Sequence, residues 1–259
     1  MRDGIDMGRV ISGTFEIYAK QIGLLLPAAL ILFLPAAVLS GLVRESGTSI
    51  LLSLVAVAVG LIAAYWFQGM TVEAVRDIQD GRRDYSVGQL FRSAMPVIGP
   101  LLVVGILAGL GIGLGLLLVI IPGLILLTIW SVVAPVVVVE RTGAVAAFGR
   151  SRELVRGNGF PVFGVIVFFF IINAIISAIL TAILTGVSDT FGGYAVASWL
   201  TNALVAPLQA IAVATLYFEL RRAHGEPEVD AGVRTPTGTA ATATTTAPPP
   251  ATDRPDIGI

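Results

Sequence analysis

The sequence predicts an all-α polytopic integral membrane protein with six transmembrane helices arranged as three hairpins, each preceded by a short amphipathic helix at the membrane surface. Composition is the first indication, because 56% of the 259 residues are hydrophobic and only 13% are charged, against about 25% in average soluble domains. The second is the presence of charge-free runs at 21–43, 46–72, 93–139, 157–188 and 190–218. A membrane span needs about 20 apolar residues. The 47-residue run at 93–139 therefore holds two spans, and Pro122-Gly123 is the expected break between them.

The first hairpin begins after a polar N-terminal segment at 1–20. Asp6 is a plausible N-cap for a short helix there, with an apolar stripe made by Met7, Val10, Ile11, Phe15 and Tyr18. Span 21–43 follows and contains two prolines, which membrane helices tolerate when neighbours satisfy the backbone. A short polar turn leads to span 49–70.

The second hairpin follows a polar seam at 71–95. Gly81 marks a turn in this seam, and Ser86 is predicted to cap a second short helix. Span 97–120 is rich in glycines at small-xxx-small spacings, which favour close helix packing: Gly105, Gly109, Gly111, Gly113 and Gly115. Span 123–139 completes this hairpin.

The third hairpin follows the seam at 140–156. Its predicted short helix places an apolar stripe on one face and the arginines off it; the stripe is Ala144, Ala147, Phe148, Ser151 and Val155. Such a helix is suited to the membrane surface. Spans 160–186 and 195–219 follow, so the membrane domain covers residues 1–222. The Thr-, Pro- and Ala-rich tail at 223–259 cannot bury a core and is expected to be disordered.

Basic residues predict the orientation. The N-terminus, the two seams and the C-terminal segment together carry 15 of the 16 Lys and Arg residues, and Arg44 alone lies on the other side. The positive-inside rule therefore places both termini in the cytoplasm of a plasma-membrane protein.

The three short helices align on a phenylalanine. Phe15, Phe91 and Phe148 each precede a span, a tight turn and a second span, so the chain reads as three copies of one unit in the same orientation. The alternative is that any short amphipathic helix before a hairpin gives this pattern by its period alone.

The block APVVVVERTGAVAAFGRSRELVRGNGFPVFG, with the preceding IIPG and the later APLQAIAVATLYFELR, resembles the membrane domain of bacterial glycerophosphoryl diester phosphodiesterases and the related YciC-type six-span proteins. The likeness covers about residues 5–222. Some members of that family carry a separate catalytic barrel of about 250 residues, whereas here only the tail follows. The resemblance implies the membrane module without the phosphodiesterase activity.

Several kinds of chemistry are not expected. A net charge of −1 gives no basic character for nucleic acid, and the absence of cysteine removes thiol chemistry. The single histidine, His224, gives no catalytic triad or metal cluster, and there is no phosphate-binding GxxxxGK[ST] loop. No carboxylate lies in mid-span, which weighs against a proton or cation relay. We therefore expect no cofactor, no metal and no catalytic residues.

Arginines in the seams are candidate contacts for anionic lipid headgroups, at about 1 kcal/mol each near a charged leaflet. These candidates are Arg82, Arg83, Arg150, Arg152 and Arg156. The alternative is ordinary topological anchoring, with a local ion pair between Glu140 and Arg141.

Polar side chains recur every four residues in the fifth span. Asn173, Ser177 and Thr181 form this stripe, and Asn202 and Gln209 lie on the sixth span. They could line a polar cavity between the two spans, or make interhelical hydrogen bonds of about 0.6 kcal/mol each.

Three functions remain open. The first is a non-enzymatic membrane module that interacts with lipids or with partner membrane proteins. The second is a transporter or permease component for a lipid or small solute. The third, an enzyme acting on membrane lipids, has the least support because the sequence offers no catalytic groups.

Overall fold

The computed structural model describes residues 5–45, 49–79, 86–185 and 191–226, and within these ranges the chain is helical without strands. The predicted disordered tail lies outside the described residues, apart from 223–226. The elements are α1 (Met7–Glu45), α2 (Ile50–Gln79), α3 (Val87–Ala94), the 3₁₀ turn η1 (Met95–Val97), α4 (Ile98–Leu118), α5 (Ile120–Ile129), α6 (Val133–Glu140), α7 (Ala144–Val155), α8 (Gly159–Thr185) and α9 (Phe191–Ala223).

Six helical segments are long and apolar enough to cross a membrane, which confirms the all-α polytopic prediction. The fourth of these spans is made of two helices, α5 and α6. The spans are Met7–Val43, Ile50–Ile78, Gly88–Leu118, Ile120–Glu140, Gly159–Leu180 and Ala195–Ala223.

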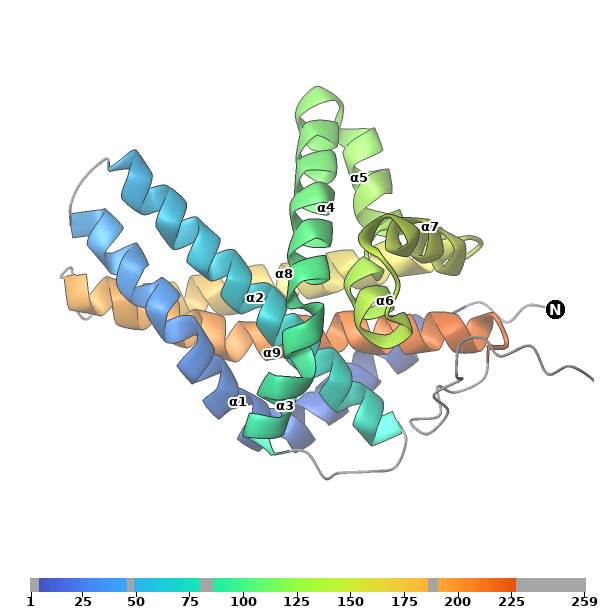
Figure 1. Cartoon of the computed structure of the whole chain (residues 1–259), viewed down its shortest axis with the longest axis horizontal. Helices are drawn as coiled ribbons and strands as arrows, with labels where there is room; N and C mark the ends of the chain where they lie inside the picture. The colour runs from blue at the N-terminus through green and yellow to red at the C-terminus, as the bar shows by residue number, and fades with distance from the viewer. Residues whose placement is uncertain (1–4, 46–48, 80–85, 186–190, 227–259) are drawn as a thin grey trace, which may run out of the picture. The chain divides into compact units, whose positions relative to one another are not determined.

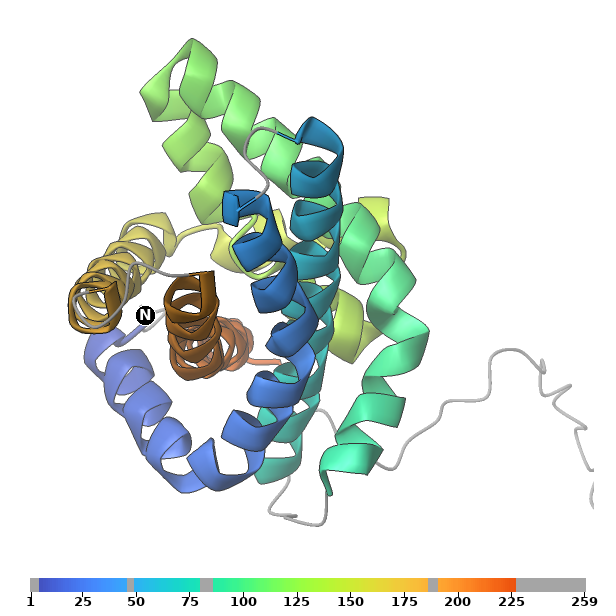
Figure 2. The same ribbon diagram turned by 90° about the vertical axis from the view of Figure 1, so that its left-hand side faces the viewer.

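The three hairpins diverge from a shared base. In Figure 1 the α4–α5 hairpin points up, the α1–α2 hairpin points to the upper left, and α8 and α9 run to the left; Figure 2 shows the same divergence from the side. We call the shared base the seam end, formed by the described residues of 5–10, 73–95, 140–158 and 217–226. The opposite tips, at the described residues 45, 49–50, 118–120, 185 and 191, are the turn end.

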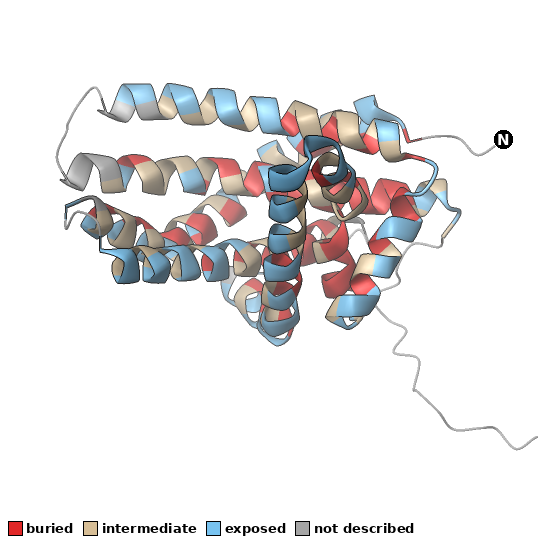
Figure 3. Ribbon diagram, turned by 90° about the horizontal axis from the view of Figure 1, so that it is seen from above, coloured by how far each residue is buried: buried red, intermediate tan, exposed pale blue. Residues whose placement is uncertain are grey.

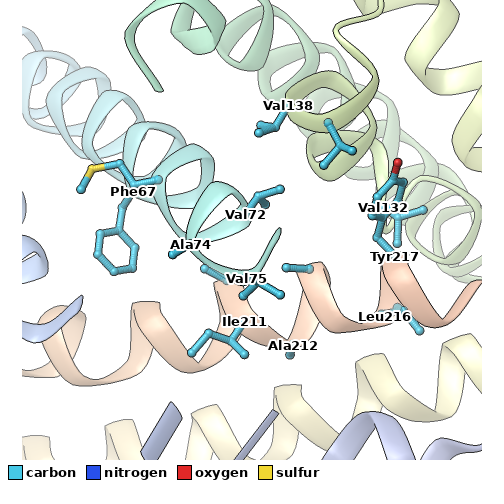
Figure 4. Close-up of a cluster of buried hydrophobic side chains, with 14 of the residues drawn as sticks. Phe67, Val72, Ala74, Val75, Val132, Val138, Ile211, Ala212, Leu216 and Tyr217 are labelled. Carbon is cyan, nitrogen blue, oxygen red and sulfur yellow. The ribbon is translucent and has the colours of Figure 1, made fainter. Parts of the chain in front are cut away.

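The hydrophobic core lies toward the seam end. Buried residues gather there, whereas the hairpin tips are largely exposed (Figure 3). Figure 4 shows side chains from α2, α9 and the α6 region converging, including Val75, Ile211 and Val138. Exposed leucines and isoleucines at the tips are what a lipid-facing surface requires, because lipid tails are as apolar as these side chains.

The short amphipathic helix expected before the first span is not separate. Residues 7–45 form one continuous helix, α1, although Pro27 and Pro35 lie within it. The junction near residue 21 carries neither a proline nor a glycine with positive φ, so nothing interrupts the backbone hydrogen bonds there. In the other two units such a breaker is present: Pro96 lies in η1 and Gly157 has φ +89°.

The other two short helices form as predicted and dock on the preceding span. Ser86 caps α3, with reciprocal hydrogen bonds to Gln89 in a capping box. Phe91 packs edge-on against Trp66 at 5.5 Å between ring centroids, and Phe148 packs edge-on against Trp130 at 4.8 Å. This matching contact supports the repeat in the second and third units.

The turn between the third and fourth spans lies at Val119 rather than at Pro122-Gly123. Val119 is extended, with φ −152° and ψ 126°, and Pro122 falls in the first turn of α5, where its missing N–H costs nothing. Gly123 instead serves packing: a Cβ there would lie 2.5 Å from the backbone nitrogen of Leu116.

The fourth span is interrupted at residues 130–132, between α5 and α6. Pro135 explains the break, because it has no N–H to donate to the carbonyl of Ser131 and its ring crowds that carbonyl. At the same interruption, the Ser151 hydroxyl of α7 donates to the carbonyl of Ile129, the last residue of α5, at 2.8 Å. The third seam helix therefore holds the interrupted span from the side.

Candidate functional site

Three glutamates at the seam end are buried or partly buried. The second span of each hairpin contributes one: Glu73 from α2, Glu140 from α6 and Glu219 from α9. The side chains of Glu73 and Glu219 are only 6% and 8% exposed, and that of Glu140 is 20% exposed. A buried carboxylate needs a cation or hydrogen-bond donors, so each of these positions requires a partner.

The predicted local ion pair between Glu140 and Arg141 is wrong. Arg141 adopts a left-handed conformation, with φ 52°, and its Nη2 lies 2.7 Å from Oε1 of Glu73. Glu140 instead accepts from Nε of Arg150 at 3.1 Å and from the hydroxyl of Tyr217 at 3.0 Å. Glu140 and Arg141 therefore connect the end of α6 to three other helices. Glu140 contacts α7 and α9, and Arg141 contacts α2.

Arg150 also binds the last described residue of the chain. Its Nη2 donates to both carboxylate oxygens of Glu226, at 2.5 and 2.6 Å, and Nε of Arg221 donates to the same carboxylate at 2.9 Å. We call this set, Glu140, Arg150, Tyr217, Arg221 and Glu226, the seam network.

The seam network shifts the pKa of its members outside the membrane. Burial by itself raises the pKa of Glu226, but the hydrogen bonds and charges of Arg150 and Arg221 outweigh it and lower that pKa below the ordinary value. For the Arg150 guanidinium, burial acts to lower the pKa. The carboxylates of Glu226 and Glu140 outweigh burial, so the pKa of Arg150 is raised above its ordinary value. Both groups are therefore charged at neutral pH.

The predicted headgroup arginines divide into two kinds. Arg150 is engaged in the seam network, so its role is structural rather than that of a free lipid contact. Arg152 and Arg156 are exposed, and neither has an ion pair within the described ranges. Arg82 and Arg83 lie outside the described residues.

An apolar groove lies beside Arg156, where α7 meets α8. Its volume is about 410 Å³, and it runs between α5 and the first turns of α8. Arg156 precedes Gly159 of the groove by three residues, a chain length of at most about 11 Å. Phe160 on the rim is 86% exposed. The groove is lined by Ile121, Leu124, Ile125, Thr128, Ile129, Gly159, Phe160 and Phe163. We call Arg152, Arg156 and this groove the corner site.

The described polar side chains of the fifth span and Asn202 of the sixth make hydrogen bonds within their own helices. The Ser177 hydroxyl donates to Oδ1 of Asn173 at 3.0 Å, and Nδ2 of Asn202 donates to the carbonyl of Ser198 at 2.8 Å, so these groups are satisfied within their own helices. The side chain of Thr181 lies outside the described residues. The cavity predicted between the two spans therefore stays a prediction for Asn173, Ser177 and Asn202, whose described hydrogen bonds lie within their own helices.

A different cavity contains Gln209. Its volume is about 240 Å³, and its polar lining comes from Gln68 of α2, Ser131 at the interruption of the fourth span and Gln209 of α9. The rest of the lining is apolar: Val165, Ile166, Phe169, Phe170, Ala212, Val213 and Leu216. We call it the mid-span cavity. Gln68 and Ser131 are 63 residues apart in the sequence, so their meeting in one cavity depends on the tertiary fold.

Within the described ranges no group of three or more His, Cys, Asp or Glu side chains could hold a metal ion. Comparison with known proteins gives no match: no protein-family model, no curated protein and no solved structure matches the chain. The resemblance to the phosphodiesterase membrane domain therefore stays a prediction.

Proposed function

We propose that this multi-pass membrane protein is a non-enzymatic lipid-binding module that holds an anionic phospholipid at the corner site. The single observation that carries the proposal is the position of exposed Arg156, three residues before Gly159 on the wall of an apolar groove of about 410 Å³. Exposed Arg152 lies four residues earlier, and neither arginine has an ion pair in the described chain. A phospholipid has the same two parts, a charged headgroup and an acyl chain.

In the proposed orientation the protein lies in the plasma membrane with its seam end facing the cytoplasm. The adjoining leaflet is rich in anionic lipid. Both described ends of the chain, Ile5 and Glu226, lie at the seam end, together with Arg152 and Arg156. Anionic lipids of the cytoplasmic leaflet attract such residues by about 1 kcal/mol each.

The test is native mass spectrometry of the full chain in mild detergent with added phosphatidylglycerol. The variant Arg152→Gln with Arg156→Gln should lose about 2 kcal/mol of headgroup attraction, or roughly thirtyfold in affinity. Arg92→Gln with Lys20→Gln removes the same charge from two exposed positions outside the corner site, one at the seam end and one in α1 where Lys20 pairs with Glu16, and serves as the control. The proposal fails if the two double variants bind the lipid equally well, or if neutral phosphatidylcholine loses affinity in parallel.

A second candidate is a carrier for a lipid or small neutral solute. It is favoured by the interrupted span beside the mid-span cavity, because transporters build substrate sites from discontinuous helices near the bilayer midplane. The test is a cysteine at Gln209, with one at the lipid-facing position Ile179 as control. Reaction of the first but not the second with a membrane-impermeant thiol reagent supports a water-accessible pathway, and equal protection of both contradicts it.

A further inference from the structure

The mid-span cavity gathers polar groups that have no hydrogen-bond partner. The hydroxyl oxygen of Ser131 is buried and unpaired among the described residues. The side-chain amides of Gln68 and Gln209 likewise make no hydrogen bond to any described group. A polar group left unsatisfied in an apolar environment costs about 1–3 kcal/mol, and here three of them face one cavity.

These groups lie at membrane depth. Gln209 is the central residue of the Ala195–Ala223 span, and Ser131 is next to the centre of the Ile120–Glu140 span. Gln68 lies five residues before Glu73 of the seam end, a rise of about 7.5 Å. Gln209 is also exposed. Interactions with water at the membrane surface cannot satisfy side chains at this depth.

The lining selects the chemistry of the occupant. Every lining side chain is uncharged, so an ionised headgroup would lose its hydration without gaining a counter-charge. Two amides and one hydroxyl offer both donors and acceptors, which match hydroxyl and ester groups. Phe169, Phe170 and the aliphatic residues provide an apolar wall toward the lipid.

We propose that the mid-span cavity binds the hydroxyl- and ester-bearing head of an uncharged glyceride such as diacylglycerol, with its acyl chains extending into the bilayer along α8. The volume of about 240 Å³ corresponds to about eight water-sized groups, which suits the glycerol ester region and is too small for the whole lipid. The inference names a ligand class for the cavity of the second candidate function, and it is independent of anionic lipid at the corner site.

The experiment uses a diacylglycerol with a photoreactive acyl chain and the full chain in phosphatidylcholine nanodiscs. Peptides from α8 and α9 should be labelled, and unlabelled diacylglycerol should compete. Gln68→Leu with Gln209→Leu should reduce saturable labelling by about tenfold or more, since each lost hydrogen bond changes affinity by about two- to tenfold. Ser131→Ala, a smaller change that leaves the packing intact, should give a reduction of about threefold.

Asn202→Leu is the matched control, because it makes a similar amide-to-leucine change on α9 outside the cavity. It should leave labelling unchanged. Unchanged labelling in the Gln68/Gln209 variant, or equal labelling of the cavity by a photoreactive phosphatidylglycerol, overturns the proposal. The Arg152/Arg156 variant should retain glyceride labelling, so failure of the corner site and failure of the mid-span cavity give different results. Glyceride bound without a water-accessible cysteine at Gln209 would retain the site and reject the carrier function.

Discussion

Nη2 of Arg141 lies 2.7 Å from Oε1 of Glu73 and so ties the loop after α6 to the end of α2. The two residues are unequally buried, since the Glu73 side chain is 6% exposed and that of Arg141 is 47% exposed. Arg76 is the other cation near Glu73, with Nη1 at 3.8 Å. The contact joins the first hairpin to the second at the seam end, and its two partners depend on it to different degrees.

Arg141→Gln should therefore lower the free energy of unfolding more than Glu73→Gln does. In Arg141→Gln the buried carboxylate of Glu73 loses its closest cation, which we expect to cost about 2–3 kcal/mol. In Glu73→Gln the amide oxygen still accepts from Arg141, whose charge remains partly hydrated, so the expected cost is about 1 kcal/mol. Thermal unfolding in detergent should show the first variant melting several degrees below the second.

Arg152→Gln controls for the loss of one positive charge from the same side of the protein. Arg152 is exposed and has no ion pair in the described chain, so its melting temperature should stay within about 1 °C of the wild type, as for most surface changes. If Glu73→Gln lowered the melting temperature more than Arg141→Gln, the unequal burial of the two side chains would not explain their contributions to stability.

Glu226 should make the stability of the seam network depend on pH. Its pKa is lowered in the folded protein, so its contribution is complete above the ordinary glutamate pKa of about 4.3 and is lost as the pH falls through the lowered value. Glu226→Gln should therefore melt below the wild type at pH 7. The difference should narrow on acidification below about pH 4, where the wild-type carboxyl also becomes neutral.

Glu153→Gln is the matched control for that measurement. Glu153 also faces Arg150, but at 3.8 Å and with a side chain 72% exposed. Exposed pairs contribute about 0–1 kcal/mol, so this variant should follow the wild type at both pH values. If the thermal unfolding curves of Glu226→Gln and Glu153→Gln coincide at pH 7, the seam network does not stabilise the end of α9.

The span count and the hairpin order follow from length and hydropathy, which is why they could be predicted. The continuity of α1 was missed because amphipathic and apolar segments were treated as separate helices, although no breaker divides them. Burial of Glu73 and its pairing with Arg141 depend on contacts 68 residues apart, which periodicity does not encode. The mid-span cavity could not be predicted for the same reason, because Gln68 and Ser131 are 63 residues apart and meet only through the tertiary fold.

The orientation can be tested with reporter fusions. We expect a fusion after Arg222 to report a cytoplasmic location and one inserted at Gly47 to report an external location, because 15 of the 16 basic residues fall in the N-terminal, seam and C-terminal segments of the sequence. Paired alkaline phosphatase and green fluorescent protein fusions give opposite readings on the two sides. The reverse pattern would overturn the proposed orientation and move the corner site to the external leaflet.

The α4–α5 hairpin should depend on particular glycines rather than on its glycine content. A Cβ at Gly115 would lie 2.9 Å from Cα of Gly123, a backbone atom that cannot move aside alone, whereas a Cβ at Gly113 would meet nothing within 4 Å. Gly115→Ala should force the helices apart at a cost of about 1–3 kcal/mol. Gly113→Ala, two residues away on the same helix, should be neutral or slightly stabilising because alanine favours the helix. Both variants replace glycine by alanine on α4, so their melting temperatures can be compared directly. Equal melting temperatures would refute the close approach of α4 and α5.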